Sequence, residues 1–215
     1  TSSPLTQTVK QQTTTSVVSS VNPSLFGSPV TFTATVVATG SVAPTGTVTF
    51  FDGATQIGTG TLTASGAATA VASFQTSTLS AGTHTVSVSY GGDADNFSST
   101  SAGLTQTVNI ASTTTALAAS ANPAIAGKSV TFTATVTANS GKAAGTVHFY
   151  NGATLLGSGT LNGAGVASYS TASLAVGTYS ITAAYQGNSN DSASTSAALP
   201  FSVIQATTAV QLISN

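Results

Sequence analysis

The stretch Thr31-Phe32-Thr33-Ala34-Thr35-Val36 decides the fold, because its apolar and hydroxyl side chains alternate strictly. The apolar side chains fall on one face and the threonines on the other, a pattern typical of a half-buried antiparallel strand. The same six residues return as Thr131–Val136, 100 positions later. A period near 100 residues corresponds to a whole domain, so the sequence predicts two tandem modules.

Further alternating stretches and turn signals follow in each repeat. Thr47–Phe50 and Thr85–Tyr90 alternate in the same way, and Asp52-Gly53 and Asn151-Gly152 suit the centres of tight hairpins. No helical periodicity interrupts them. The sequence therefore predicts an all-β fold of two tandem immunoglobulin-like β-sandwiches, each with seven to eight antiparallel strands in Greek-key order and no disulfide.

The repeat also sets the expected domain boundaries. Leu5–Val9 is identical to Leu104–Val108, and Thr207–Val210 resembles Thr114–Leu117. We expect residues 1–11 to be the last strand of a preceding repeat, 12–110 the first Ig-like domain, 111–206 the second, and 207–215 the first strand of a following repeat. The short linker Val108–Thr113 favours an extended rod over a freely jointed chain.

The composition excludes several classes of function. Charged residues make up 3% of the chain, the net charge is -1, and cysteine is absent. We therefore expect no nucleic-acid partner, because such proteins need a basic surface. Disulfides and thiolate metal sites are excluded. No apolar run reaches the length of a membrane-spanning helix, so we expect no membrane insertion.

Two clusters of oxygen-bearing side chains are the candidate metal sites. They comprise Asp93, Asp95 and Asn96 in the first repeat, and Asn188, Asn190 and Asp191 in the second. Carboxylate and amide oxygens would accept a weakly bound Ca²⁺. The alternative is that these side chains cap turns, and it is favoured because Asn and Asp exchange places between the repeats. We expect no other cofactor.

Four further side chains have expected places in the sandwich. In Ig-like folds a tyrosine near the start of the sixth strand bonds back to the preceding corner, and His84 and Tyr179 occupy that position. Phe51 and Tyr150 are expected to project outward, where they could stack on a sugar ring or cover a sheet edge.

Catalytic patterns are missing, so the sequence predicts that the protein is not an enzyme. No Gly-x-Ser-x-Gly elbow occurs between a strand and a helix. The second repeat holds a single acid, Asp191, which excludes paired carboxylates there. A Lys–Asn isopeptide bond is also rejected, because glutamate is absent and Lys128 and Lys142 lie in expected loops.

Several motifs resemble a known family. They are the stretches 22–36 (NPSLFGSPVTFTATV), 46–53 (GTVTFFDG), 79–93 (LSAGTHTVSVSYGGD) and 104–108 (LTQTV). This pattern resembles the bacterial Ig-like repeats of group 3. The resemblance implies a secreted or cell-surface protein that acts as a stalk, spacer, filament or adhesion array, with neighbouring Ig-like repeats as its partners. Binding of a cell-surface glycan and self-association by strand exchange through the terminal segments are the alternatives.

Overall fold

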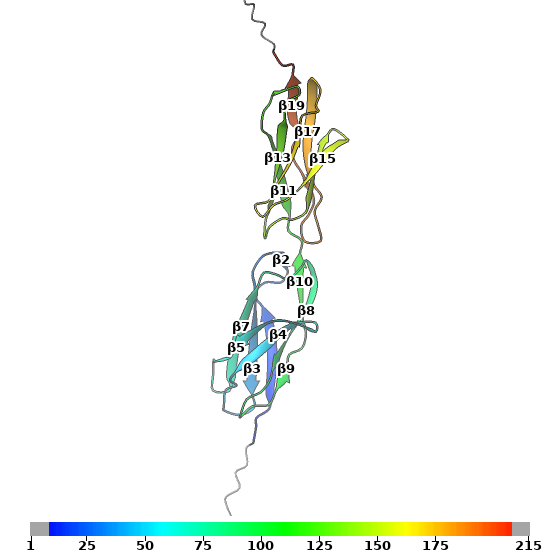
Figure 1. Cartoon of the computed structure of the whole chain (residues 1–215). Helices are drawn as coiled ribbons and strands as arrows, with labels where there is room; N and C mark the ends of the chain where they lie inside the picture. Colours follow the sequence, from blue (N-terminus) through cyan, green and yellow to red (C-terminus); the bar gives the residue numbers. More distant parts are fainter. Residues whose placement is uncertain (1–8, 208–215) are drawn as a thin grey trace, which may run out of the picture. The chain divides into compact units, whose positions relative to one another are not determined.

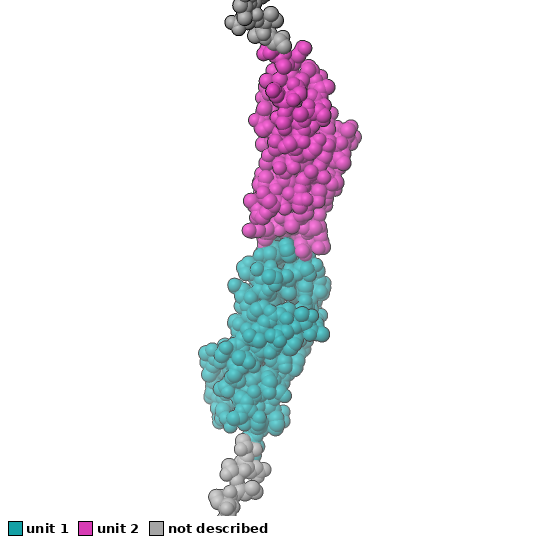
Figure 2. All heavy atoms as spheres, viewed as in Figure 1, with its two compact units in different colours: residues 1–109 teal, residues 110–215 magenta. Residues whose placement is uncertain are grey.

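The computed structural model describes residues 9–207, which form two compact units divided between Asn109 and Ile110 (Figures 1 and 2). Unit 1 runs to Asn109 and unit 2 begins at Ile110. Over the described range, no helix is long and apolar enough to cross a membrane. Residues 1–8 and 208–215, which make up most of the terminal strands expected at 1–11 and 207–215, lie outside the described residues.

Unit 1 is a sandwich of two sheets (Figure 1). The first sheet has the order β1 (Thr13–Ser19), β3 (Val30–Ala38), β7 (Thr69–Thr76), β6 (Thr63–Ala64). The second has the order β2 (Ser24–Leu25), β10 (Leu104–Asn109), β8 (Gly82–Tyr90), β4 (Thr47–Asp52), β5 (Thr55–Thr61), and β9 (Ser99–Thr100) also pairs with β8.

Unit 2 repeats this architecture with one strand fewer. Its first sheet has the order β11 (Thr113–Ala119), β13 (Val130–Ala138), β16 (Val166–Thr171). Its second has the order β12 (Ala124–Ile125), β19 (Leu199–Ile204), β17 (Gly177–Tyr185), β14 (Thr146–Asn151), β15 (Thr154–Thr160), with β18 (Ser194–Thr195) on β17. Unit 2 has no counterpart of β6 among these strands.

The predicted all-β tandem sandwich is confirmed, but the described residues form ten and nine strands where seven to eight were expected, and the pairing is not wholly antiparallel. β2 pairs with β10 in parallel, and β12 pairs with β19 in the same way. The reason is that the first strand of each unit splits at its Asn-Pro. Its first part joins one sheet and its second part crosses to the other, where it runs beside the last strand.

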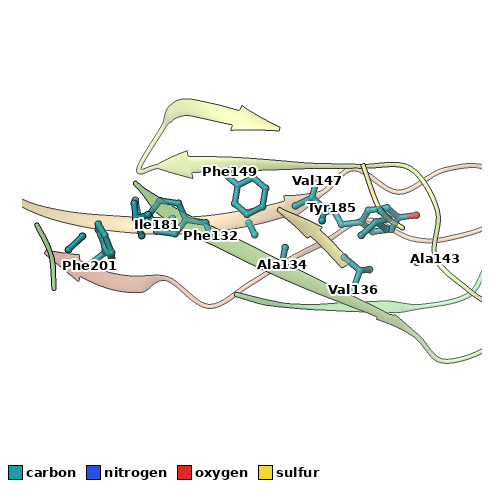
Figure 3. Close-up of a cluster of buried hydrophobic side chains, with 14 of the residues drawn as sticks. Phe132, Ala134, Val136, Ala143, Val147, Phe149, Ile181, Tyr185 and Phe201 are labelled. Carbon is teal, nitrogen blue, oxygen red and sulfur yellow. The ribbon is translucent and has the colours of Figure 1, made fainter. Parts of the chain in front are cut away.

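The alternating pattern places the apolar side chains in the core. Phe32 and Phe50 are fully buried in unit 1, and Phe132 and Phe149 are their equivalents in unit 2 (Figure 3). Ile181, which stands where many Ig domains have a disulfide cysteine, is also fully buried. Aliphatic and aromatic packing therefore replaces the disulfide.

Glycines in β5 and β15 let the two sheets approach at the edge of each sandwich. A Cβ atom at Gly58 would overlap the ring of Phe74, and one at Gly157 would overlap the ring of Tyr169. The ring centroid of Phe74 lies 5.5 Å from that of Phe50 in the core. The Gly-x-Gly pattern of these strands is therefore a packing requirement, which the sequence reading did not use.

The hairpin turns are offset by one residue from the prediction. Asp52 pairs with Thr55, so Gly53 and Ala54 are the central residues of the turn, instead of Asp52 and Gly53. Gly53 has a φ of 56°, while Asp52 stays in the strand. In the second unit Asn151 pairs with Thr154, so the same correction applies there. The physical reason is that the side chain of residue 52 or 151 bonds to the neighbouring strand.

Candidate functional site

The predicted oxygen cluster of unit 1 lies in loop 91–98, between β8 and β9. Asp93 Oδ1 accepts hydrogen bonds from Asp95 N at 2.9 Å and Asn96 N at 2.8 Å. Its Oδ2 accepts from the N and Oγ1 of Thr45, both at 2.8 Å. Burial opposes ionisation of Asp93, but these hydrogen bonds outweigh it and hold the pKa well below its ordinary value.

Loop 186–193 of unit 2 has the same design with the amide and carboxylate exchanged. Asn188 Oδ1 accepts from Asn190 N at 2.7 Å and from Asp191 N at 2.8 Å. Asn188 Nδ2 donates to Asp191 Oδ2 at 2.9 Å, as Asn96 Nδ2 donates to Asp93 Oδ1 at 2.9 Å. Both repeats keep a hydrogen-bonded pair of one Asp and one Asn. This pairing explains why the two residue types change places together.

Each carboxylate also lies close to a core tyrosine. Burial, together with the neighbouring Asp93, raises the pKa of Tyr90 to about 12. Burial and the charge of Asp191 raise the pKa of Tyr185. Both tyrosines are 1% exposed. The exchange of Asp and Asn therefore leaves one carboxylate beside the tyrosine in each unit.

These loops fix the residue that precedes the first strand of each unit. Gln11 N donates to Asp95 O at 2.7 Å, and Phe97 N donates to Gln11 O at 2.8 Å. Ala111 N donates to Asn190 O at 2.8 Å in the same way. Gln11, which the sequence assigned to a preceding repeat, is thus bonded to unit 1.

The hydrogen bonds at Asp93 and Asn188 are those of capped turns, and calcium binding stays a prediction. The oxygens of Asp93 face N–H and O–H donors, whose positive ends would repel a cation. Asp191 is 2% exposed, and its Oδ1 has no hydrogen-bond partner within the described structure. Across residues 9–207, no three His, Cys, Asp or Glu side chains form a metal-binding group. A calcium site would therefore have to rely mainly on neutral oxygens.

The two predicted corner residues bond back to the preceding turn. Tyr179 donates from its hydroxyl to Ala175 O at 2.7 Å. His84 Nε2 lies 2.9 Å from Ser80 O, which occupies the equivalent place. The opposite nitrogen, His84 Nδ1, lies 2.6 Å from Asp52 Oδ2. The sequence reading missed this ion pair, because the two residues are 32 positions apart.

Both ring nitrogens of His84 therefore face oxygen acceptors, an arrangement that only the doubly protonated imidazolium satisfies. Burial by itself lowers the pKa of His84. The hydrogen bond and charge of Asp52, with the bond to Ser80, outweigh burial and hold the pKa above its ordinary value.

Unit 2 has neutral groups at the same corner. Tyr179 replaces His84, and Asn151 Oδ1 accepts from Ser180 N at 3.1 Å. Thr85 N donates to Asp52 Oδ1 in the corresponding place at 3.2 Å. The ion pair is therefore an addition of unit 1 to a bond that both units share.

The candidate contact residues Phe51 and Tyr150 are half-buried on β4 and β14. Phe51 pairs across the hairpin with Gln56, and Tyr150 pairs with Leu155, which is 52% exposed. The hydroxyl of Tyr150 lies 3.3 Å from His148 Nδ1. Each residue covers one face of the hairpin in its own unit, and a role in surface contact stays a prediction.

Each unit contains an asparagine clamp, formed by Asn22 or Asn122, that the sequence did not predict. Asn22 Nδ2 donates to Thr105 O at 2.7 Å, and its Oδ1 accepts from Thr107 N at 3.0 Å. Asn122 makes the equivalent bonds to β19, at 2.8 and 3.2 Å. The side-chain amide thus acts as a short piece of strand that joins the beginning of each unit to its last strand.

Fold and loops together define a tandem Ig-like sandwich protein in which the repeated polar residues hold the structure together. The sequence profile of the bacterial Ig-like domain (group 3) matches residues 14–109 and 117–204. The chain therefore belongs to this family, as the resemblance implied. No curated protein sequence matches the chain.

Several solved structures are similar to it. The fibronectin(III)-like modules of Clostridium thermocellum CbhA are 21% identical, with a TM-score of 0.39, over 94% of this chain and all (100%) of that one. The Yersinia pseudotuberculosis adhesin InvE is 17% identical, with a TM-score of 0.41, over 87% of this chain and 58% of that one. The Escherichia coli adhesin FdeC is 17% identical, with a TM-score of 0.34, over 88% of this chain and 64% of that one.

Proposed function

We propose that the chain is a non-catalytic spacer segment of an extracellular bacterial repeat protein, with each unit carrying tension from its first strand to its last. The observation that carries this proposal is where the chain enters and leaves a unit. Gln11 is held by loop 91–98 beyond the end of β8, while Val108 pairs with Gly82 at the start of β8. β8 has nine residues, so entry and exit lie about 30 Å apart at opposite ends of the unit.

The bonds between the entry and exit strands suit a load-bearing role. β2 and β10 run parallel, and Phe26 N extends this pairing with a bond to Asn109 O at 2.8 Å. The Asn22 clamp adds two bonds between the same regions. Tension applied at the two ends shears these bonds together, because strand hydrogen bonds lie across the strand axis.

The surface chemistry supports an extracellular location for the protein. With three Lys and no Arg, the chain offers few sites to proteases that cleave after basic residues. Hydroxyl side chains replace charges on the outer faces of the strands, and cysteine is absent.

Neighbouring Ig-like repeats are the proposed partners. The strand-exchange alternative depends on terminal residues outside the described range, and no contact observed within the units favours glycan binding.

Single-molecule stretching of the full chain, tethered at both ends, tests the proposal. We expect two separate unfolding events, and Asn22→Ala should lower the force of one of them. Thr63→Ala on β6 is the control, because it leaves the entry and exit strands unchanged. Unfolding of both units at forces no larger than those for an unstructured chain would refute the load-bearing role, and so would equal effects of the two variants.

A further inference from the structure

The two units differ at one place where their sheets are otherwise equivalent. Leu62 and Leu161 mark the same position, since the N of each donates to the O of the glycine that precedes β4 or β14, at 2.9 Å in both units. Between this leucine and the point where the two units become equivalent again, unit 1 has the seven residues 63–69, whereas unit 2 has only the three residues 162–164.

In unit 1 the longer segment completes the edge of the first sheet. Thr63 and Ala64 form β6 and pair with β7. The chain then turns, and Ala68 O accepts a hydrogen bond from Ala38 N at 2.8 Å. Ala38, at the end of β3, is consequently 6% exposed.

In unit 2 the corresponding edge stays open. β13 pairs with β16 only as far as Thr135 and Val166, and one more bond joins Val136 N to Gly165 O at 2.8 Å. Ala138, the counterpart of Ala38, is only half-buried. Asn139 N bonds to Ser112 O on the β11 side, so the alternation of strand hydrogen bonds directs the N–H of Ala138 to the opposite side. That side is where unit 1 places Ala68.

A hollow of about 380 Å³ occupies this place in unit 2. Its walls are the end of β13 (residues 136–138), the short turn 163–165 and the loop residues 141–143. Lys142 is the one charged side chain among the residues that line it. The hollow thus combines an open strand edge, backbone of small residues and one positive charge.

We propose that this hollow is an acceptor site for a short extended peptide, which adds to the edge of β13 as a strand. Main-chain pairing to an open sheet edge is an established mode of peptide recognition. Unit 1 indicates which peptide fits, because the C=O of its own Ala68 makes the bond to β3 that the edge of β13 lacks. The peptide therefore has small side chains, with an acidic residue to meet Lys142.

The position of the acid follows from the strand direction. In unit 1, Ala68 directly precedes β7, which pairs with β3 in antiparallel fashion, so the peptide runs antiparallel to β13. Its amino-terminal end then lies beyond Ala138, toward the loop that carries Lys142. The matching probe is the peptide Asp-Gly-Ala-Ala-Thr with both ends blocked, in which the acid precedes the run of small residues.

Amide NMR titration of the full isotope-labelled chain with this peptide tests the proposal. We expect concentration-dependent shifts at Ala138, Lys142 and Gly165, and none at Ala38. A control peptide with proline in place of the second alanine should produce no shifts, because proline fixes φ at about −65°, far from the value of about −140° in an antiparallel strand. Equal shifts with the proline peptide would overturn strand addition, as would an absence of shifts or shifts in both units. Sodium acetate alone is the second control, and if it reproduced the shifts the hollow would be an anion site instead.

Two variants complete the test. Lys142→Gln should weaken the peptide up to about fivefold at low salt, which corresponds to an exposed ion pair. Replacing residues 162–164 by the stretch Thr63–Thr69 should abolish binding and slow hydrogen exchange of the Ala138 amide toward that of Ala38. Unchanged peptide binding in this folded loop transplant would refute the proposed location.

Discussion

Substitution of Gly58 by alanine is the sharpest test of how the sandwiches are packed. An added Cβ would overlap the ring of Phe74, which itself packs on Phe50 in the core. Overpacking of this kind costs about 1–3 kcal/mol. Alanine also restricts the unfolded chain, which offsets the cost by about 0.4–1 kcal/mol. We therefore expect unit 1 to lose about 1–2 kcal/mol of unfolding free energy.

Calorimetric unfolding of the full chain, with NMR to assign each transition to a unit, measures this loss. In a domain of this size each kcal/mol lowers the unfolding temperature by about 4–8 °C. Gly91→Ala is the matched control, because no atom lies within 4 Å of its added Cβ and its φ is outside the range unfavourable to alanine. Gly157→Ala should lower the transition of unit 2 in the same way, since its added Cβ meets Tyr169.

A double-mutant cycle with Phe74→Leu identifies the cause. Leucine removes the ring that the new methyl group meets, so the double variant should be more stable than the sum of the two single effects predicts. Strict additivity would refute the explanation. So would a Gly58→Ala variant that is as stable as Gly91→Ala, because the glycine would then serve no packing purpose.

Four further outcomes are expected. A histidine whose pKa is raised in the folded state stabilises the protein below its unfolded pKa of about 6.5, and this stabilisation is lost as the pH rises through the folded pKa. Unit 1 should therefore lose stability between mildly acidic and alkaline pH. His84→Gln should remove this pH dependence in equilibrium unfolding. Asn122→Ala should cost unit 2 about 1–3 kcal/mol in denaturant unfolding, because two backbone groups of β19 lose their partner; a loss confined to unit 1 would contradict the clamp. Tyr179→Phe should cost unit 2 about 0.5–1.5 kcal/mol, and no change would mean that water replaces the corner bond. Millimolar calcium should leave both unfolding temperatures unchanged, and a rise that Asp93→Asn abolishes would restore the calcium interpretation.

The sequence was sufficient for the sheets, since strict alternation at Thr31–Val36 and its copy fixes which side chains are buried. It was less informative about how each strand ends. The hairpin prediction was wrong by one residue, because Asp52 is held in the strand by contacts with His84 and Thr85, which are distant in sequence. The parallel pairing of β2 was missed for a similar reason, since a two-residue strand has no periodicity to detect.

The candidate oxygen clusters show the same division. The exchange of Asp and Asn between repeats was visible in the sequence and pointed to turns. Only the structure showed that residues 93 and 96 bond to each other, so that one carboxylate and one amide are kept as a pair.

By itself, the sequence determined the period, the alternation, the absence of disulfides and the family, because these depend on local spacing and composition. The tertiary structure alone decided the His84–Asp52 ion pair, the asparagine clamps, the contact of Gly58 with Phe74 and the open edge of β13. Each of these depends on residues that are far apart in the chain. Strand pairing within one sheet brings His84 to Asp52 and the asparagines to the last strands, whereas the packing of the two sheets brings Gly58 to Phe74.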